Sequence, residues 1–134
     1  MIKVKGIDHV GVAVKDGDDA ATAYKLLGLG VEHVEEIPDG GLKVAMLPVG
    51  DSSIELLEPT RADSTVARFL DKRGEGIHHL AVRVEDIQGA VSELLAAGVR
   101  MIDQTPRPGA HGTMVAFVHP AATHGVLIEL VEGI

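Results

Sequence analysis

The chain contains no cysteine and no tryptophan, and its only other aromatic residues are one tyrosine and two phenylalanines. Without cysteine it can form no disulfide, thiol nucleophile or thiolate metal ligand. Hydrophobic residues still make up 46% of the 134 positions, so the core has to be aliphatic. This length suits one domain of ordinary size, and we expect a single domain over residues 1–134.

Positive charge is also scarce, because 12 Lys and Arg face 20 Asp and Glu, which gives a formal net charge of −8. Nucleic-acid binding needs a basic surface, so we expect no nucleic-acid partner. No apolar run approaches the roughly 20 residues of a membrane span, and the first residues do not resemble a signal peptide. We therefore expect no membrane association. Since the absence of cysteine fits a reducing compartment, we expect a cytoplasmic location.

The most informative feature is an internal repeat. The stretch IDHVGVAVKD is followed 70 residues later by IHHLAVRVED, and both have histidine at the third position. Further on, residues 46–48 match residues 118–120 at an offset of 72, and residues 54–58 match residues 128–132 at an offset of 74. The small drift falls where loops are expected. We interpret the pattern as one structural module used twice.

Each module predicts the element order βαβββ. The first module, about residues 5–58, has an alternating strand from residue 7, followed by a helix over 20–27 and extended runs over 31–37, 42–47 and 53–57. The second module, about residues 77–132, has a strand over 77–84, a helix over 87–97 and strands over 100–104, 114–118 and 126–131. Residues 59–76 connect the modules and include a short helix near 64–70.

This uneven alternation of strands and helices favours an α+β fold with mixed or antiparallel sheet over a doubly wound fold. Helices on the outside would leave two concave sheet faces. We therefore expect paired βαβββ modules that form an open, incompletely closed barrel-like cleft.

Strand alternation places four chemically active side chains on the faces that are not aliphatic. His9 and Glu55 lie there in the first module, and His79 and Glu129 lie at the equivalent positions of the second. A buried carboxylate is costly without a partner. Two histidines and two glutamates at matching repeat positions require a shared explanation, and a divalent metal ion provides one. We predict that these four residues bind it.

Two imidazoles and two carboxylates form a nitrogen and oxygen site. An octahedral ion would keep two positions for water or substrate, whereas zinc more often prefers closed tetrahedral sites or cysteine. Co, Mn, Ni, Fe and Mg are therefore candidates beside Zn. Taken singly, each of the four residues could also be an ordinary hydrogen-bonded histidine or edge glutamate. The other histidines are interpreted as structural, with His111 on its glycine loop the nearest candidate for a substrate contact.

Several longer stretches connect these residues to a known family: residues 54–59, 69–79, 109–112, 115–120 and 125–130. In their order and spacing, the chain resembles the vicinal oxygen chelate superfamily, which includes glyoxalases, bleomycin resistance proteins and dioxygenases. Within it, the chain resembles the methylmalonyl-CoA epimerase branch over nearly its whole length. The resemblance implies paired βαβββ modules, often a homodimer, and metal ligation by His9, Glu55, His79 and Glu129.

The resemblance also implies a reaction on an acyl-CoA substrate, the interconversion of (2R)- and (2S)-methylmalonyl-CoA through abstraction of the C2 proton, a metal-stabilised enolate and reprotonation. Glu129 resembles the family residue that is an acid/base as well as a ligand. Some members carry the other acid/base as a glutamate where this chain has Val44, and valine cannot transfer a proton. Glu55, a metal-bound water or another group would then take that role, unless the activity is a different one.

Other functions on the same scaffold stay open at this stage: a glyoxalase-type isomerase, a thiol transferase, an extradiol dioxygenase, or a metal-free protein that sequesters a drug. The last class generally uses an aromatic-lined groove, which this composition does not favour. The positively charged residues that could bind the phosphates of CoA are Arg61, Arg68, Lys72, Arg73 and Arg107. Taken alone, each of them is better interpreted as an ordinary charged residue on the surface.

Overall fold

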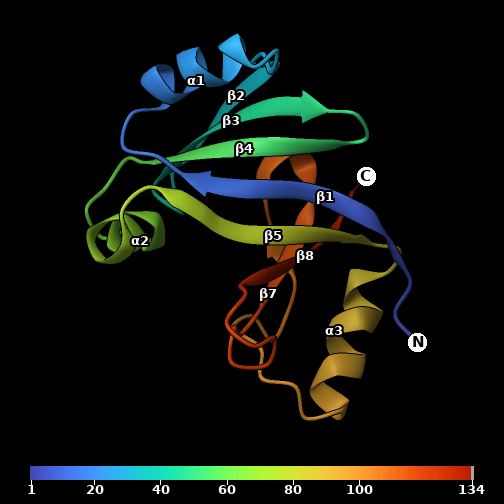
Figure 1. Cartoon of the computed structure of the whole chain (residues 1–134). Coiled ribbons are helices and arrows are strands. Elements are labelled where there is room, and N and C mark those ends of the chain that lie inside the picture. The colour runs from blue at the N-terminus through green and yellow to red at the C-terminus, as the bar shows by residue number, and fades with distance from the viewer. Residues whose placement is uncertain (134) are drawn as a thin grey trace. The chain divides into compact units, whose positions relative to one another are not determined.

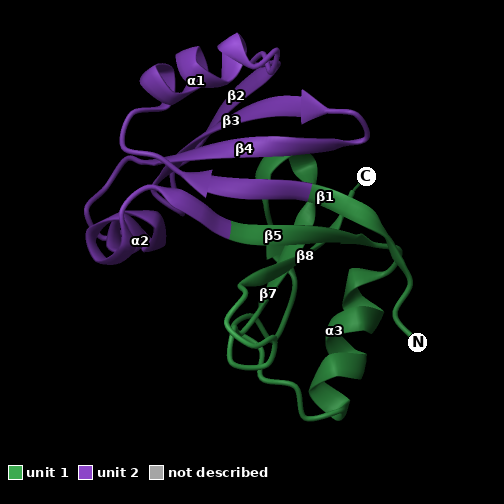
Figure 2. Cartoon of the chain, viewed as in Figure 1, with its two compact units in different colours: residues 1–8, 79–134 green, residues 9–78 purple. Residues whose placement is uncertain are grey.

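A computed structural model describes residues 1–133 of the chain. The chain divides into two compact units, which Figure 2 shows in different colours. The first unit, as named here, is residues 9–78, drawn in purple and keyed as unit 2 in Figure 2. The second unit combines residues 1–8 with those from His79 onward, drawn in green and keyed as unit 1. Among the described residues, no helix is long and apolar enough to cross a membrane.

The first unit contains most of the first predicted module and the connector (Figure 1). Its elements are β1 (Val4–Ala13, of which residues 4–8 belong to the second unit), α1 (Gly17–Leu26), β2 (His33–Ile37), β3 (Leu42–Val49), β4 (Ser52–Pro59) and α2 (Thr65–Arg73). The strand order is β2-β3-β4-β1. β2, β3 and β4 pair antiparallel, and β4 pairs parallel with β1.

The second unit repeats this plan. Its elements are β5 (Gly76–Val84, of which residues 76–78 belong to the first unit), α3 (Ile87–Ala96), β6 (Arg107–Pro108), a 3₁₀ turn (Ala110–Gly112), β7 (Met114–Val118) and β8 (Ile128–Glu132). The order is β5-β8-β7-β6, with β5 and β8 parallel and the other pairs antiparallel. The α+β fold and the repeated βαβββ order are therefore confirmed.

The core has an outer and an inner layer in each unit, as the alternation predicts. The outer layers pack under α1 and α3, and their fully or nearly fully buried members include Leu47 and Leu56 in the first unit and Val91 and Val118 in the second. Burial of each such side chain contributes about 1.5–3 kcal/mol to stability. The inner layers are smaller clusters: Ala13, Val44, Leu57 and Val66 in the first unit, and Ala81, Val115 and Val131 in the second.

Two helices start at matching aspartates. Asp16 caps α1 by accepting hydrogen bonds from the N–H groups of Asp18 and Asp19, and Asp86 caps α3 by accepting one from Gly89. An N-cap carboxylate satisfies helix donors that have no partner within the helix. Because Asp16 is the cap, α1 begins at Gly17, three residues before the predicted start of the helix at residue 20.

Two sequence predictions are wrong. The strand predicted over residues 100–104 is reduced to one bridge between Met101 and Val118, and the short edge strand is β6, residues 107–108. Proline at position 108 lacks an N–H to donate, which limits pairing there. The strand pairing also places Met46 opposite Glu55 and Phe117 opposite Glu129, so these equivalents lie 71 residues apart, not 72.

Candidate metal centre

His9 and Glu55 meet in the first unit. β1 and β4 run parallel, with His9 opposite Ser53 and Gly11 opposite Glu55, so both side chains project from the same sheet face. Each residue is 5% exposed. The His9 Nδ1 and Glu55 Oε2 atoms lie 3.4 Å apart. The structure therefore brings the two predicted residues of the first module together in a buried pair.

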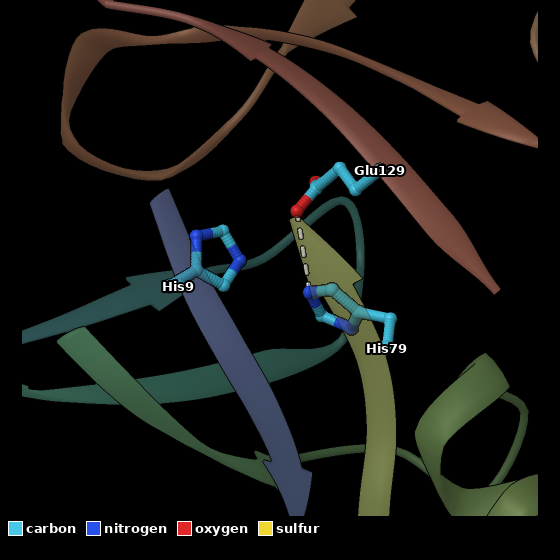
Figure 3. Close-up of side chains that lie close together, drawn as sticks. All are labelled: His9, His79 and Glu129. Atoms are coloured by element: carbon cyan, nitrogen blue, oxygen red, sulfur yellow. Dashed lines mark ion pairs between the residues drawn. The ribbon is translucent and has the colours of Figure 1, made fainter. Parts of the chain in front are cut away.

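His79 and Glu129 form the equivalent pair in the second unit. Ala81 lies opposite Glu129 in the parallel pair of β5 and β8. His79 is 6% exposed and Glu129 is 7% exposed. The His79 Nε2 and Glu129 Oε1 atoms are 3.2 Å apart, as the dashed line in Figure 3 marks. The second predicted pair is thus also formed and buried.

The donor chemistry of both pairs suits a divalent cation. Each pair presents one imidazole and one carboxylate, a combination that Mn, Fe, Co, Ni and Zn sites in proteins use. A buried carboxylate beside an imidazole also needs further compensation for its lost hydration. A cation would supply that compensation to both pairs. Whether all four side chains share a single ion stays a prediction.

Phe117, which the sequence did not indicate as a site residue, lies beside His79. Its ring packs edge-on against the His79 ring, with centroids 5.4 Å apart and an interplanar angle of 85°. The Phe117 backbone N–H donates to Asp103 Oδ2 at 2.8 Å. Arg107 donates from Nε to Asp103 Oδ1 at 3.1 Å, and its guanidinium lies 5.6 Å from the Phe117 centroid. A repeat alignment shifted by one residue, with Phe117 instead of Val118 matched to Met46, would have indicated this position.

Val44 lies on the same face of the first unit as Glu55. It is 1% exposed and packs with Ala13, Leu57 and Val66, the last of which belongs to α2. The position where some family members carry an acid/base is therefore a closed aliphatic contact here. Lys43 lies on the opposite face of β3, as the alternation predicts, and pairs across the strands with Glu58.

Arg61 is already engaged in the fold. Its Nη1 donates to the Pro38 carbonyl at 2.6 Å, its Nη2 donates to the Asp39 carbonyl at 3.2 Å, and its Nε donates to Asp63 Oδ1 at 3.0 Å. The Arg61 hydrogen bond, and secondly its positive charge, hold the pKa of Asp63 below its usual value. Arg61 therefore stabilises the turn between β2 and β3 through these hydrogen bonds.

Among the other histidines, several have structural contacts. The His78 ring packs edge-on against Phe69 with centroids 4.9 Å apart. His119 Nδ1 accepts a hydrogen bond from the Ala121 N–H at 3.0 Å in a turn. His111 has a φ of 59°, a left-handed conformation that is uncommon outside glycine, in the 3₁₀ turn before β7.

Comparison with known proteins gives a consistent result. Residues 8–117 match the Glyoxalase/Bleomycin resistance protein/Dioxygenase superfamily. The chain is 40% identical to the ethylmalonyl-CoA/methylmalonyl-CoA epimerase of Cereibacter sphaeroides, over 92% of this chain and 95% of that protein. It is 38% identical to the mitochondrial methylmalonyl-CoA epimerase of Homo sapiens, over 92% of this chain and 72% of that protein.

The chain is also similar to a solved structure over nearly its whole length. A methylmalonyl-CoA epimerase in complex with methylmalonyl-CoA and NH4⁺ has a TM-score of 0.92 to this chain at 38% identity. The match covers 98% of this chain and 96% of that one.

Proposed function

Since this chain belongs to the glyoxalase/bleomycin resistance protein/dioxygenase superfamily, we propose that it is a metal-dependent epimerase, an isomerase that interconverts (2R)- and (2S)-methylmalonyl-CoA. The observation that carries this proposal is the pair of buried His–Glu contacts, 3.4 and 3.2 Å, on equivalent strands of the two units. Similarity to methylmalonyl-CoA epimerases over more than nine-tenths of the chain supports an acyl-CoA substrate. Because the Cereibacter relative is an ethylmalonyl-CoA/methylmalonyl-CoA epimerase, we include ethylmalonyl-CoA among the proposed substrates of this chain.

In this proposal His9, Glu55, His79 and Glu129 bind one divalent metal ion, with Co, Mn, Ni, Fe, Mg and Zn as candidates. The two nitrogen and two oxygen donors suit such an ion. When bound, the ion would act as a Lewis acid toward the negative charge that develops on the thioester oxygen. The four side chains would hold it, and two of them would also handle the proton.

Inversion at C2 requires proton removal on one face and proton return on the other. We assign these roles to Glu129 and Glu55. One carboxylate takes the proton as the C2–H bond breaks, and the electron pair of that bond moves into the thioester group. The other group, in its protonated form, delivers a proton to the opposite face of C2. Val44 supports the assignment to Glu55, because an aliphatic side chain fills the alternative position.

Proton exchange tests this function directly. Metal-loaded protein is incubated with (2R)-methylmalonyl-CoA in D₂O, and deuterium at C2 and the formation of the (2S) epimer are followed. We expect both, and we expect Glu129→Gln to abolish formation of the (2S) epimer. Absence of exchange in the metal-loaded protein would reject the epimerase assignment, and near-normal turnover by Glu129→Gln would reject the role of that residue. Turnover of a glutathione hemithioacetal instead would favour a glyoxalase-type isomerase.

We also propose that residues 1–134 act as a single domain and that the chain is a homodimer in the cytoplasm. The family match over residues 8–117 supports the single domain, the family resemblance supports the dimer, and the cysteine-free composition supports the compartment. Sedimentation equilibrium checks the dimer, which a monomer mass would reject. The human relative is mitochondrial, so the compartment needs its own test. Cell fractionation provides it.

A further inference from the structure

The two strands that carry the proposed glutamate ligands each have a second glutamate at or next to their last residue, with a different partner. Glu58 lies three residues after Glu55 and accepts a hydrogen bond from the Gly17 N–H, with Oε1 2.6 Å from the nitrogen. Glu132 lies three residues after Glu129 and accepts one from the Ile87 N–H at 2.8 Å. Both bonds are partly buried and join residues 41 and 45 positions apart in the chain. The same contact is thus made in both units.

The donor in each case is the first residue of a helix, Gly17 of α1 or Ile87 of α3. The first N–H groups of a helix have no partner within the helix and carry partial positive charge, so a carboxylate is stabilised there. Asp16 already accepts from the N–H groups of Asp18 and Asp19, and Asp86 accepts from that of Gly89. Each helix start is therefore completed by a carboxylate from a distant strand.

The geometry ties together the ends of two parallel strands in each unit. In the second unit β5 ends at Val84, α3 begins at Ile87, and Arg83 lies opposite Val131, the residue before Glu132. In the first unit Ala13 lies opposite Leu57, the residue before Glu58, and the Val14 N–H donates to the Leu57 carbonyl at 3.0 Å. The glutamate thus anchors the end of one strand to the helix that directly follows the other.

We propose that Glu58 and Glu132 are positioning residues that fix the register of the β1–β4 and β5–β8 pairs, and with it the placement of Glu55 and Glu129. The inference rests on the proposed function. Hydrogen bonds of a parallel pair are evenly spaced, so they do not by themselves mark one register. A slip of one residue would turn the ligand glutamate to the other sheet face. A slip of two residues would keep its face but displace it by about 6.6 Å. Either slip would break the hydrogen bond between the glutamate and the helix start.

Cobalt binding tests the inference apart from turnover. Wild type, Glu132→Ala, Glu132→Asp and Glu132→Gln are titrated with Co²⁺ while the visible absorption spectrum is recorded. The exposed Glu32 provides a matched control, since Glu32→Gln also removes one surface carboxylate. We expect Glu132→Ala and the shorter Glu132→Asp to lose about 10–100-fold in cobalt affinity and to shift the spectrum, a range usual for changes outside the ligand shell. We expect Glu132→Gln, which keeps the acceptor oxygen, to be affected least.

Amide hydrogen exchange in the metal-free protein provides a second readout. The Leu80 N–H bonds to the Leu127 carbonyl at 3.0 Å between β5 and the approach to β8, and the Val14 N–H reports on β1 and β4. We expect faster exchange of Leu80 in Glu132→Ala and of Val14 in Glu58→Ala, and no change at either amide in Glu32→Gln. If Glu132→Ala does not fold, Glu132→Asp gives the same comparison.

Folded Glu132→Ala and Glu58→Ala with cobalt affinity, spectrum and amide exchange within twofold of wild type would overturn the inference. The proposed function fails separately, if the wild type epimerises methylmalonyl-CoA with none of the candidate divalent ions. If the wild type binds no cobalt, the exchange of Leu80 and Val14 decides the register claim.

Discussion

Val44 lies directly opposite Leu57 in the antiparallel pair of β3 and β4, and its side chain is 1% exposed. Leu57 is 3% exposed and two residues after Glu55 on the same face of β4. The inner face of the first unit therefore has an aliphatic wall beside the buried Glu55, and the half-buried Glu35 lies opposite Val44 on β2. Glu55 is the buried carboxylate that the first unit can contribute as an acid/base.

Glu55→Gln is the substitution that isolates this role. The amide oxygen can still bind a metal ion, but the amide cannot exchange a proton at C2. We expect metal content to be retained and epimerisation to fall by at least about 100-fold, the lower range for loss of an acid/base group. In D₂O one epimer should exchange its C2 proton through Glu129 without inverting. Chiral analysis of the deuterated product checks this.

The matched control for that experiment is Glu36→Gln, because Glu36 is an exposed carboxylate on β2. It should epimerise like the wild type. If Glu55→Gln inverts C2 within tenfold of the wild-type rate, Glu55 is not the second acid/base and another group on the chain must be.

Arg61 is expected to stabilise the fold without binding CoA. Its donors are directed at the carbonyls of Pro38 and Asp39 and at the carboxylate of Asp63. We expect Arg61→Ala to lower the free energy of unfolding by no more than about 1 kcal/mol, because the lost hydrogen bonds are exposed. The KM for methylmalonyl-CoA should stay unchanged. Denaturant unfolding and steady-state kinetics measure the two quantities, with the exposed Arg100→Ala as the control.

The same substitution should also raise the pKa of Asp63 toward its ordinary value of 3.8, since Arg61 is the main cause of the lowering. A carboxyl whose pKa is lowered by folding stabilises the fold above its unfolded pKa, and that contribution is lost as pH falls through the folded value. The contribution of the Arg61–Asp63 contact should therefore be present at neutral pH and fade below about pH 4, whereas the hydrogen bonds of Arg61 to the two backbone carbonyls should persist. A raised KM in Arg61→Ala would instead indicate contact with the substrate.

The outer layer of the first unit is less completely packed than that of the second. A pocket of about 230 Å³ lies between α1 and the sheet, and it is lined by residues that include Ala21, Val31, Val34, Lys43, Leu56 and Glu58. None of the ten residues of α1, all of which the structure describes, is buried, whereas α3 buries Ile87, Ala90 and Val91. The repeat aligns Ala21 with Val91, which is 2% exposed.

Ala21→Val should therefore stabilise the protein. Two added methyl groups in the pocket contribute about 0.8 kcal/mol each, and the β-branched residue costs about 0.5 kcal/mol in a helix. We expect a gain of about 1 kcal/mol in the free energy of unfolding, measured by urea titration. Ala23→Val, on the exposed side of α1, should give only the helix cost. Equal effects of the two substitutions would show that the pocket cannot be filled from α1.

The sequence was enough to predict the repeat, the element order and the sheet face on which His9, Glu55, His79 and Glu129 lie, because strand alternation and a duplicated module impose two constraints on each residue. The start of α1 was placed three residues late, because the run from Asp16 to Asp19 offers several helix-capping residues and the sequence does not show which of them is the cap. The contact of Phe117 with His79 was missed because the sequence match of Pro48 with Pro120 hid the true strand register. Pro48 lies inside β3, but Pro120 lies in the turn after β7.

The helix anchors of Glu58 and Glu132 could not be predicted either. Both lie near the end of an aliphatic strand, where a charged side chain is common. Their partners are backbone N–H groups, which the sequence does not distinguish from one another. Only the pairing of Ala13 with Leu57 and of Arg83 with Val131 brings each glutamate to a helix start.

The central claim is that both His–Glu pairs hold one shared ion, and native mass spectrometry of the metal-loaded chain tests it most directly. We predict one divalent ion per chain in the wild type and none in either His9→Ala or His79→Ala, because each substitution removes a ligand of the same ion. Two ions per wild-type chain, or an ion retained by His9→Ala but not by His79→Ala, would contradict the claim.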